Sequence, residues 1–283
     1  MSPHSPSSSV EEARLALGQR LDGIRRDAGL SARTLAARAG WHESKCSRIR
    51  NGKTLPSEAD IRAWTLHCGV PDQAGDLIAT ARGVEGMYVE WRRRTRTGLR
   101  HVQQAVVPLY ERTRHFRIYE PGVIPGLLQT PAYAISLMGA IVAFQRIPDD
   151  TEAAVAARIE RQRVLRQGTH TFAVLLEESA LRAQVADPEV MAGQLGHLLQ
   201  AASLPSVSLG IISQSTRRTM WPVEGFWIFD SERVLVELVT AEVTVTQPRE
   251  IELYSRTFAK LAGLAVHGAG ARALITAAIA ALG

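Results

Sequence analysis

Residues 29–57 read GLSARTLAARAGWHESKCSRIRNGKTLPS and contain two short helical patterns separated by a glycine. Ser31 precedes the first pattern, where a hydroxyl can accept from the free amides of a first helical turn. Leu35 and Ala36 then begin an apolar face at helical spacing. Gly40 stands where the chain must turn sharply, and glycine adopts the left-handed backbone conformation without steric cost. We therefore predict a supporting helix, a tight corner at Gly40 and a second helix.

The second pattern, residues 42–50, has the composition of a helix that reads DNA. Cys46 and Ile49, three residues apart, form an apolar inner stripe, and Asn51-Gly52 is a typical helix stop. The side chains outside this stripe are polar or basic, and we predict that they enter the major groove. With their neighbours, the predicted DNA-binding residues are Arg33, His42, Glu43, Ser44, Lys45, Ser47, Arg48, Arg50, Asn51 and Lys53.

The positive charge of the chain is concentrated in its first part. Residues 1–100 hold 17 Lys and Arg against 11 Asp and Glu, a net charge of +6, whereas residues 101–283 hold 16 against 17. A local excess of this kind favours polyanion binding, because each neutralised phosphate releases condensed counterions. The charge distribution therefore supports double-stranded DNA as the partner of the first part.

The N-terminal sequence resembles helix-turn-helix domains of the Xre, Cro and λ-repressor type, in the version found in actinobacterial regulators. The resemblance covers about residues 14–80 and is carried by GWHESKCSRI (40–49), NGK (51–53) and PSEADIRAW (56–64). It implies an all-α, five-helix domain that binds DNA as a homodimer. Two positions depart from the pattern: Ala32 stands where the family usually has glutamine, and His42 where it often has a capping serine.

Length and composition indicate two folded domains. The 283 residues are 46% hydrophobic, which suffices for two cores. We expect a disordered tail over residues 1–10, the DNA-binding domain over 11–85, a basic linker helix over 86–100 and a second domain over 101–283. The two cysteines, Cys46 and Cys68, are interpreted as core thiols, and no metal site or cofactor is expected.

The chain offers no sign of a membrane protein. Residues 1–9 lack the apolar segment of a secretory signal, and the apolar stretch 271–282 is too short to span a bilayer. We therefore expect a cytoplasmic, nucleoid-associated protein.

The linker contains a basic run at Arg92, Arg93, Arg94 and Arg96. It either lies along the DNA backbone, adding salt-dependent affinity without sequence choice, or is a solvated connector. Trp91 is interpreted as an anchor that packs the linker onto one domain.

The second domain mixes helical and strand patterns. Helical spacing predicts helices over 102–116, 130–144, 150–167, 188–202, 254–264 and 269–282. The helix over 150–167 is expected to turn Val155, Ile159 and Leu165 inward and its arginines and glutamates outward. Short β-rich runs predict strands over 171–176, 206–212, 225–229 and 234–239. The predicted fold class is α+β overall, with a mixed α/β second domain.

Three segments of this second part carry a further resemblance. They are WRRRTRTGLRHVQ (91–103), EPGVIPGLLQTPAYA (120–134) and a closing pattern of Tyr254, Phe258 and Leu261. From about residue 87 onward the sequence is similar to the C-terminal domain, of uncharacterised function, of actinobacterial WhiJ-like regulators. Such relatives are encoded beside a small partner protein and are linked to development, antibiotic production or toxin-antitoxin-like control. This resemblance implies that the second domain receives a protein or ligand signal.

An enzyme is not indicated. The sequence lacks GxSxG, GxxxxGK[ST] and HExxH, and its eight histidines are scattered. Glu177 and Glu178 are paired carboxylates at a strand end, but adjacent strand residues point to opposite faces and are usually solvated.

Three hypotheses follow from the sequence. The leading one is a transcription regulator, a repressor acting as a homodimer on an operator. The second is an antitoxin-like adaptor that binds a small cognate partner protein and regulates its own operon. The third is a sensor of a small-molecule effector, with a ligand pocket lined by aromatic residues. The residues of this predicted pocket are Trp221, Phe226, Trp227 and Phe229.

Overall fold

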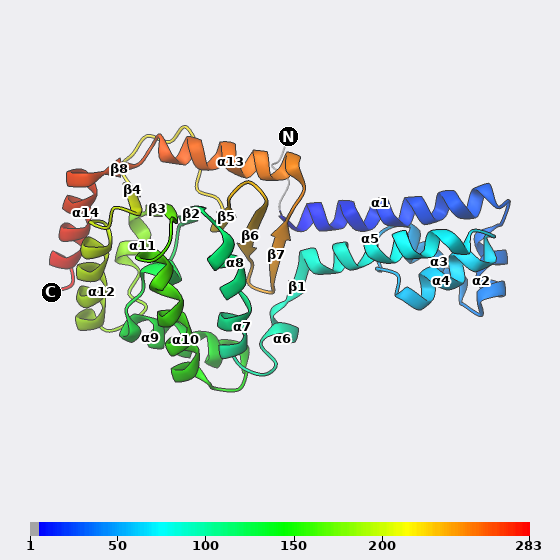
Figure 1. The fold of residues 1–283 in the computed structure, drawn as a ribbon, viewed down its shortest axis with the longest axis horizontal. Helices are drawn as coiled ribbons and strands as arrows, with labels where there is room; N and C mark the ends of the chain where they lie inside the picture. The colour runs from blue at the N-terminus through cyan, green and yellow to red at the C-terminus, as the bar shows by residue number, and fades with distance from the viewer. Residues whose placement is uncertain (1–5) are drawn as a thin grey trace. The chain divides into compact units, whose positions relative to one another are not determined.

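The computed structural model describes residues 6–283, except for the side chains of residues 6–10, 85–90, 92 and 93. The chain forms two compact units, Met1–Val89 and Glu90–Gly283 (Figure 1). Among the described residues, no helix combines the length and the apolar character that crossing a bilayer requires.

The described part of the first unit is helical. Its elements are α1 (Pro6–Asp27), α2 (Ala32–Ala39), α3 (Glu43–Arg50), α4 (Glu58–His67), the 3-10 turn η1 (Pro71–Gln73) and α5 (Ala74–Met87). The all-α, five-helix helix-turn-helix fold predicted for this region is therefore confirmed.

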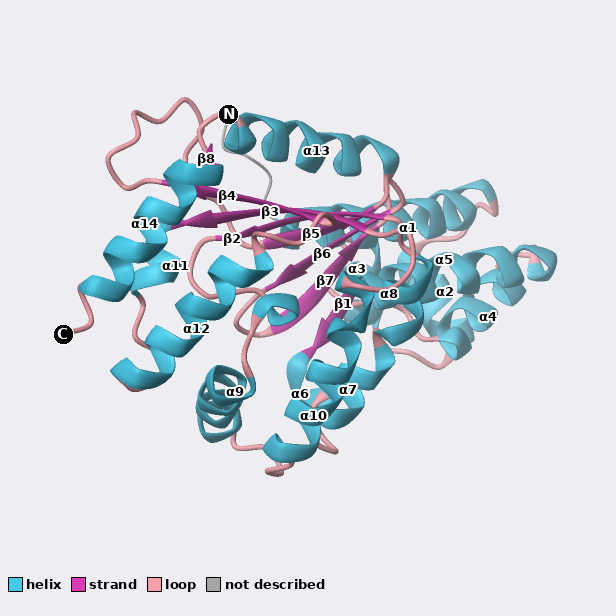
Figure 2. Cartoon of the chain, turned by 60° about the vertical axis from the view of Figure 1, so that its left-hand side comes forward, coloured by secondary structure: helices cyan, strands magenta, loops and turns pink. Residues whose placement is uncertain are grey.

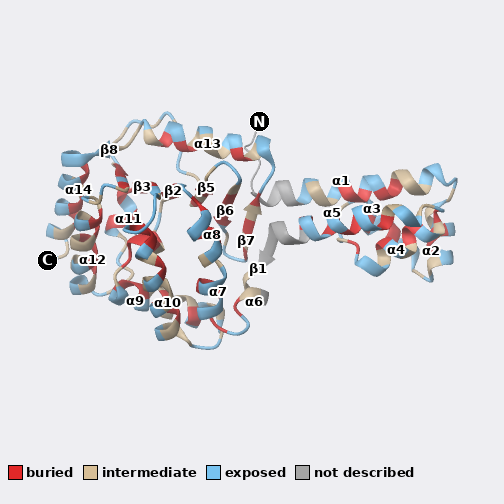
Figure 3. Cartoon of the chain, viewed as in Figure 1, coloured by how far each residue is buried: buried red, intermediate tan, exposed pale blue. Residues whose placement is uncertain are grey.

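One apolar core holds these helices together, and Figure 3 shows buried residues on α1, α3, α4 and α5. Trp64 lies at its centre, 1% exposed, and its indole nitrogen donates to the carbonyl of Leu21 on α1 at 2.9 Å. Both cysteines are free thiols buried in this core, as predicted. Gly18 of α1 lies against the carbonyl oxygens of Ile49 and Arg50, where a Cβ would have no room. Glycine at this position therefore lets α1 approach the end of α3.

The second unit is built around a mixed sheet (Figure 2). Its helices are α6 (Trp91–Arg94), α7 (Arg100–Ala105), α8 (Val107–Arg112), α9 (Pro131–Gln145), α10 (Thr151–Arg161), α11 (Glu178–Arg182), α12 (Pro188–Ala201), α13 (Pro248–Ala262) and α14 (Gly268–Ala280), with 3-10 turns η2 (Gly126–Leu128) and η3 (Gln162–Leu165). Its strands are β2 (His115–Glu120), β3 (Thr171–Glu177), β4 (Val207–Ile212), β5 (Phe226–Phe229), β6 (Arg233–Glu237), β7 (Ala241–Val245) and β8 (Val266–His267).

The strand order is β1-β7-β6-β5-β2-β3-β4-β8, in which β1 (Tyr88–Glu90) falls at the boundary between the units. Strands β2, β3 and β4 are parallel, whereas β5 runs antiparallel to β2 and continues through β6 and β7 as a meander. The mixed α/β character predicted for the second domain is confirmed, including strands close to the four predicted.

Helices cover both faces of this sheet. In Figure 2, α13 lies on one side of the strands, and α9, α12 and α14 lie on the other. The main core combines α12 and α14 with Phe116, Phe172 and Leu209 of the sheet. A smaller apolar cluster, including Met138 and Val155, joins α9 to α10.

The structure corrects several expectations about local structure. The helix predicted over 102–116 is two short helices followed by β2, because Thr113 takes an extended conformation and Phe116 pairs with both Phe172 and Phe229. Residues 86–100 are not one helix: α5 ends at Met87, β1 follows, and Gly98 turns the chain with φ of 98°. Residues 1–5 of the expected tail lie outside the described part, and α1 already begins at Pro6, a residue that suits a first helical turn.

Candidate nucleic-acid interface

The corner between α2 and α3 has the geometry that its residues predict. The Ser31 hydroxyl accepts from the amide of Thr34 at 3.0 Å, which caps α2. Gly40 ends α2 in the left-handed conformation, with φ of 69°. The Trp41 amide then donates to the carbonyl of Ala36 at 2.8 Å, so the chain reverses within two residues. These bonds fix the angle at which α3 leaves the corner.

Helix α3 begins at a histidine cap. His42 is extended, and its Nδ1 accepts from the amide of Ser44 at 3.3 Å. The Ser44 hydroxyl lies 2.8 Å from the same nitrogen. His42 therefore occupies the capping position that resembling proteins often give to serine. At the other end, Asn51 closes α3 and Gly52 takes a positive φ of 66°, as the stop signal predicts.

The inner and outer sides of α3 are clearly separated. Cys46 and Ile49 are 2% and 1% exposed and belong to the core of the first unit. Nine predicted DNA-binding residues are exposed: Arg33, His42, Glu43, Ser44, Ser47, Arg48, Arg50, Asn51 and Lys53. The structure thus brings a polar surface together on α3 and the turns that flank it.

Lys45 is the exception among the predicted contact residues. It is half-buried, and its Nζ lies 2.6 Å from Oδ1 of Asp60 on α4 and 4.7 Å from the centre of the Trp41 ring. Burial raises the pKa of Asp60, but the hydrogen bonds from Lys45 and Ser57 outweigh that effect, so the net pKa is lowered. Lys45 therefore ties the second motif helix to the next helix, a role that only the tertiary structure discloses.

The arginines of the basic run at residues 92–96 do not share one environment. The side chains of Arg92 and Arg93 lie outside the described residues, and Arg96 is exposed. Arg94 forms an ion pair with Glu242 and has a side chain only 16% exposed, which corrects the expectation that it lies along DNA. The Trp91 indole donates to the carbonyl of Leu238 at 2.8 Å. Trp91 thus anchors this segment to the second unit, as the sequence suggested.

A cavity of about 480 Å³ lies within the second unit. Of the predicted pocket residues, Trp227 and Phe229 line it, whereas Phe226 is in the core with 0% exposure and Trp221 is 55% exposed outside it. The difference follows from strand alternation, because Trp227 and Phe226 are neighbours on β5 and point to opposite faces. Two of the four predicted residues therefore line this cavity, and two do not.

The opposite wall of the cavity carries two arginines of α10. Arg158 Nη1 donates to Oε1 of Gln129 at 2.6 Å, and its Nε donates to Oε1 of Gln103 at 3.1 Å. Arg161 is 6% exposed, with Cζ 4.5 Å from the centre of the Tyr110 ring. The helical pattern predicted arginines and glutamates on the outer side of this helix, because helical periodicity does not distinguish solvent from a cavity. A residue of the EPGVIPGLLQTPAYA segment, Gln129, thus helps to position one of them.

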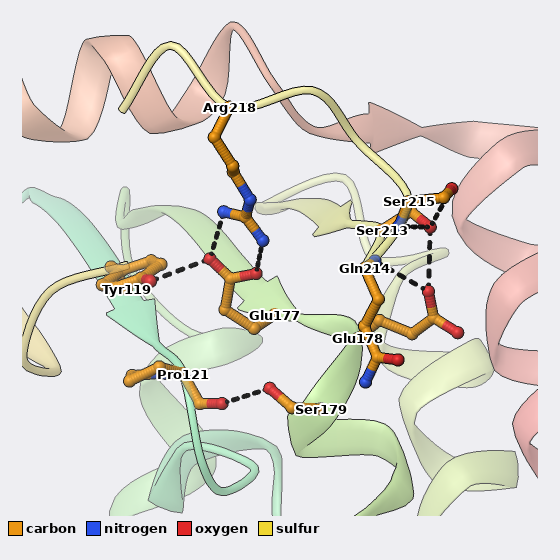
Figure 4. Close-up of polar contacts among 9 residues, drawn as sticks. All are labelled: Tyr119, Pro121, Glu177, Glu178, Ser179, Ser213, Gln214, Ser215 and Arg218. Atoms are coloured by element: carbon orange, nitrogen blue, oxygen red, sulfur yellow. Dashed lines mark hydrogen bonds and ion pairs between the residues drawn. The ribbon is translucent and has the colours of Figure 1, made fainter. Parts of the chain in front are cut away.

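The paired carboxylates at the end of β3 are buried rather than solvated, which corrects the sequence-based expectation (Figure 4). Glu177 accepts from Arg218 at 2.7 Å and from the Tyr119 hydroxyl at 2.8 Å. Glu178 accepts from the Gln214 amide at 3.0 Å.

The environment of Glu178 explains its ionisation. The Gln214 amide lowers its pKa most, burial opposes this, and Ser213 and Arg182 lower it further. Both carboxylates therefore hold the loop between β4 and β5 against the ends of β2 and β3. Their hydrogen-bonding capacity is used by the protein itself.

Comparisons with known families agree with this geometry. A family model described as a helix-turn-helix domain matches residues 16–77, which span the corner, α3 and the core around them. The first unit is a helix-turn-helix domain, which indicates a DNA-binding regulator. A second model, described as a domain of unknown function (DUF5753), matches residues 103–277. Since this match covers more than half of the chain, the chain belongs to the DUF5753 family. A search of curated proteins found no match.

Proposed function

We propose that this protein is a sequence-specific transcription regulator of the Xre type, which represses its target genes as a homodimer. The observation that carries the proposal is the two-sided character of α3. Its apolar seam is buried in the core, while the polar residues predicted to contact DNA, except Lys45, are exposed. The net charge of +6 over residues 1–100 supports the same partner.

Recognition follows from the dimensions of DNA. An α-helix fits the major groove, where each base pair presents a distinct pattern of donors and acceptors. Arg48 is suited to guanine and Ser44 to several bases, while Arg33 and Lys53 are suited to phosphates. In a dimer, two copies of α3 would contact half-sites about 34 Å apart, one turn of the duplex. The operator is then expected to be palindromic or repeated.

The second unit is proposed to receive the signal that controls DNA binding. The cavity beside Trp227 supports a small-molecule signal. The resemblance to actinobacterial WhiJ-like regulators supports a non-enzymatic role in a cytoplasmic, nucleoid-associated protein.

The decisive experiment begins with selection of preferred duplexes from a random pool by the full-length protein. On the selected duplex, replacing Arg48 by alanine should cost about 1–3 kcal/mol of binding free energy. It should also reduce the discrimination between bases at one position of the duplex. Arg112→Ala is the matched control, because Arg112 is an exposed arginine of the second unit and its loss changes the net charge equally.

Two outcomes would contradict the proposal. The protein could prefer no duplex over random competitor at modest ionic strength, or Arg48→Ala could behave like Arg112→Ala. The adaptor hypothesis is separated by co-purification: a stable stoichiometric complex with a small protein that changes DNA affinity would favour it.

A further inference from the structure

The cavity of the second unit contains positive charge that the surrounding carboxylates do not neutralise through contact. Arg158 and Arg161 are three residues apart on α10, so they share one face of the helix. Their hydrogen-bond acceptors are neutral amide oxygens: the side chains of Gln103 and Gln129 for Arg158, and the backbone carbonyl of Gln103 for Arg161. Two neighbouring guanidinium groups held in this way attract an anion.

Arg161 also has an unused donor. Its side chain is 94% buried, and its Nε has no hydrogen-bond partner among the described residues. A buried donor without a partner is unfavourable, so such groups usually have an acceptor in the functional state.

Among the described residues, the carboxylates that line the cavity form no ion pair with Arg158 or Arg161. Glu120 accepts from the Trp227 indole at 2.7 Å, and burial, followed by the charge of Glu237, raises the pKa of Glu120 to about 8. Glu120 is therefore largely neutral near pH 7. Glu242 is paired with Arg94, and Glu237 is exposed at the end of β6.

Many of the other lining residues are apolar. Val102, Val106, Met138, Ile141 and Leu235 contribute to it, together with Trp227. The volume of about 480 Å³ is within the range of small-molecule sites, which are mostly apolar with a few placed polar groups.

We propose that this cavity binds a small amphipathic anion, an apolar ring system or chain that carries one acidic group, with that group in contact with Arg158 and Arg161. Its role as the signal of a regulator rests on the function proposed above, whereas the binding itself does not. The segment around Gln129, which is prominent in the sequence, then has a purpose: it positions Arg158 for the ligand.

The test uses two dyes that share one apolar body. The anionic probe is 1-anilinonaphthalene-8-sulfonate, and the neutral probe is N-phenyl-1-naphthylamine, which lacks the sulfonate. Both fluoresce in apolar surroundings, so their affinities for the full-length protein are measured by titration without DNA. Wild type should bind the anionic dye in a one-to-one complex.

The variants separate charge from shape. Arg158→Gln and Arg161→Gln should each lower the affinity for the anionic dye by about tenfold to a hundredfold. The affinity for the neutral dye should not change. Arg161→Lys, which keeps the charge, should restore part of the affinity. Val106→Trp fills the cavity and should weaken both dyes. Arg163→Gln is the matched control, because Arg163 is paired with Glu111 and Glu160 at the surface.

Several results would overturn the proposal. The first is that wild type does not bind the anionic dye, and the second is that Arg161→Gln and Arg163→Gln bind it with equal affinity. The third is that the arginine variants lose affinity for both dyes equally, and the fourth is that Val106→Trp changes neither affinity. Circular dichroism confirms that each variant is folded. Because Arg161→Gln should still bind the selected duplex, a failure of DNA binding and a failure of the cavity proposal are distinguishable.

Discussion

Gly18→Ala offers a sharp test of how α1 positions α3. A Cβ at Gly18 would lie 2.9 Å from the carbonyl oxygen of Arg50 and still closer to that of Ile49. Both obstacles are backbone atoms at the end of α3, so they cannot move as a flexible side chain would. Gly23 of the same helix is the matched control, since a Cβ there would meet no atom within 4 Å.

The two substitutions share one contribution and differ in the other. Alanine is favoured over glycine in a helix interior by about 1 kcal/mol, and this gain applies at both positions. Overpacking a tight contact costs about 1–3 kcal/mol, and this cost applies only at Gly18. We therefore expect Gly23→Ala to stabilise the first unit by about 1 kcal/mol. The free energy of unfolding of the Gly18→Ala variant should be about 1–3 kcal/mol lower than that of the Gly23→Ala variant.

Native-state hydrogen exchange at the amides of α1 and α3 measures this difference in the first unit without interference from the second. Gly18→Ala should also weaken binding to a selected duplex, because relief of the contact displaces α3 from the corner. If Gly18→Ala proved as stable as Gly23→Ala, the close approach of α1 to the end of α3 would be refuted.

Three further outcomes are expected. Arg218→Met should destabilise the second unit by about 3 kcal/mol in denaturant unfolding, because it leaves Glu177 buried with one fewer partner; an effect below that of an exposed arginine substitution would contradict the anchoring role. Lys45→Ala and Asp60→Ala should be non-additive by about 1 kcal/mol or less in a double-mutant cycle on the first unit, since the pair is partly exposed, and strict additivity would argue against the contact. Burial and the charge of Glu237 raise the pKa of Glu120 from 4.5 to about 8. Between these two values the folded state keeps a proton that the unfolded state releases, so the stability of the folded state should decrease as the pH rises from 4.5 to about 8. Glu120→Gln should flatten this dependence in unfolding curves recorded across the window, and an unchanged slope would refute the assignment.

The comparison of sequence with structure separates local from non-local signals. The corner at Gly40, the buried pair Cys46 and Ile49 and the helix stop at Asn51 and Gly52 were predictable, because each depends on residues within a few positions of the chain. Strand β2 was not predicted, because the helical pattern before it continues into Phe116. Its pairing with β3 and β5 brings together segments more than 50 residues apart, which sequence periodicity does not detect.

The candidate sites divide in the same way. The polar side of α3 could be predicted, since an amphipathic helix with a known inner face must expose the other. The role of Lys45 could not, because Asp60 lies on another helix. The cavity arginines were assigned to the solvent, since the helical pattern of residues 150–167 gives Arg158 and Arg161 no visible partner in the chain.

The sequence by itself determined the helix-turn-helix motif, its boundaries and the order of domains. These features arise from backbone preferences and from apolar periodicity, both of which act over short distances. Only the tertiary structure decided which charged side chains are exposed on α3, which are used in packing, and which line a cavity. Those outcomes depend on burial and on partners that distant parts of the chain supply, and a linear pattern contains neither.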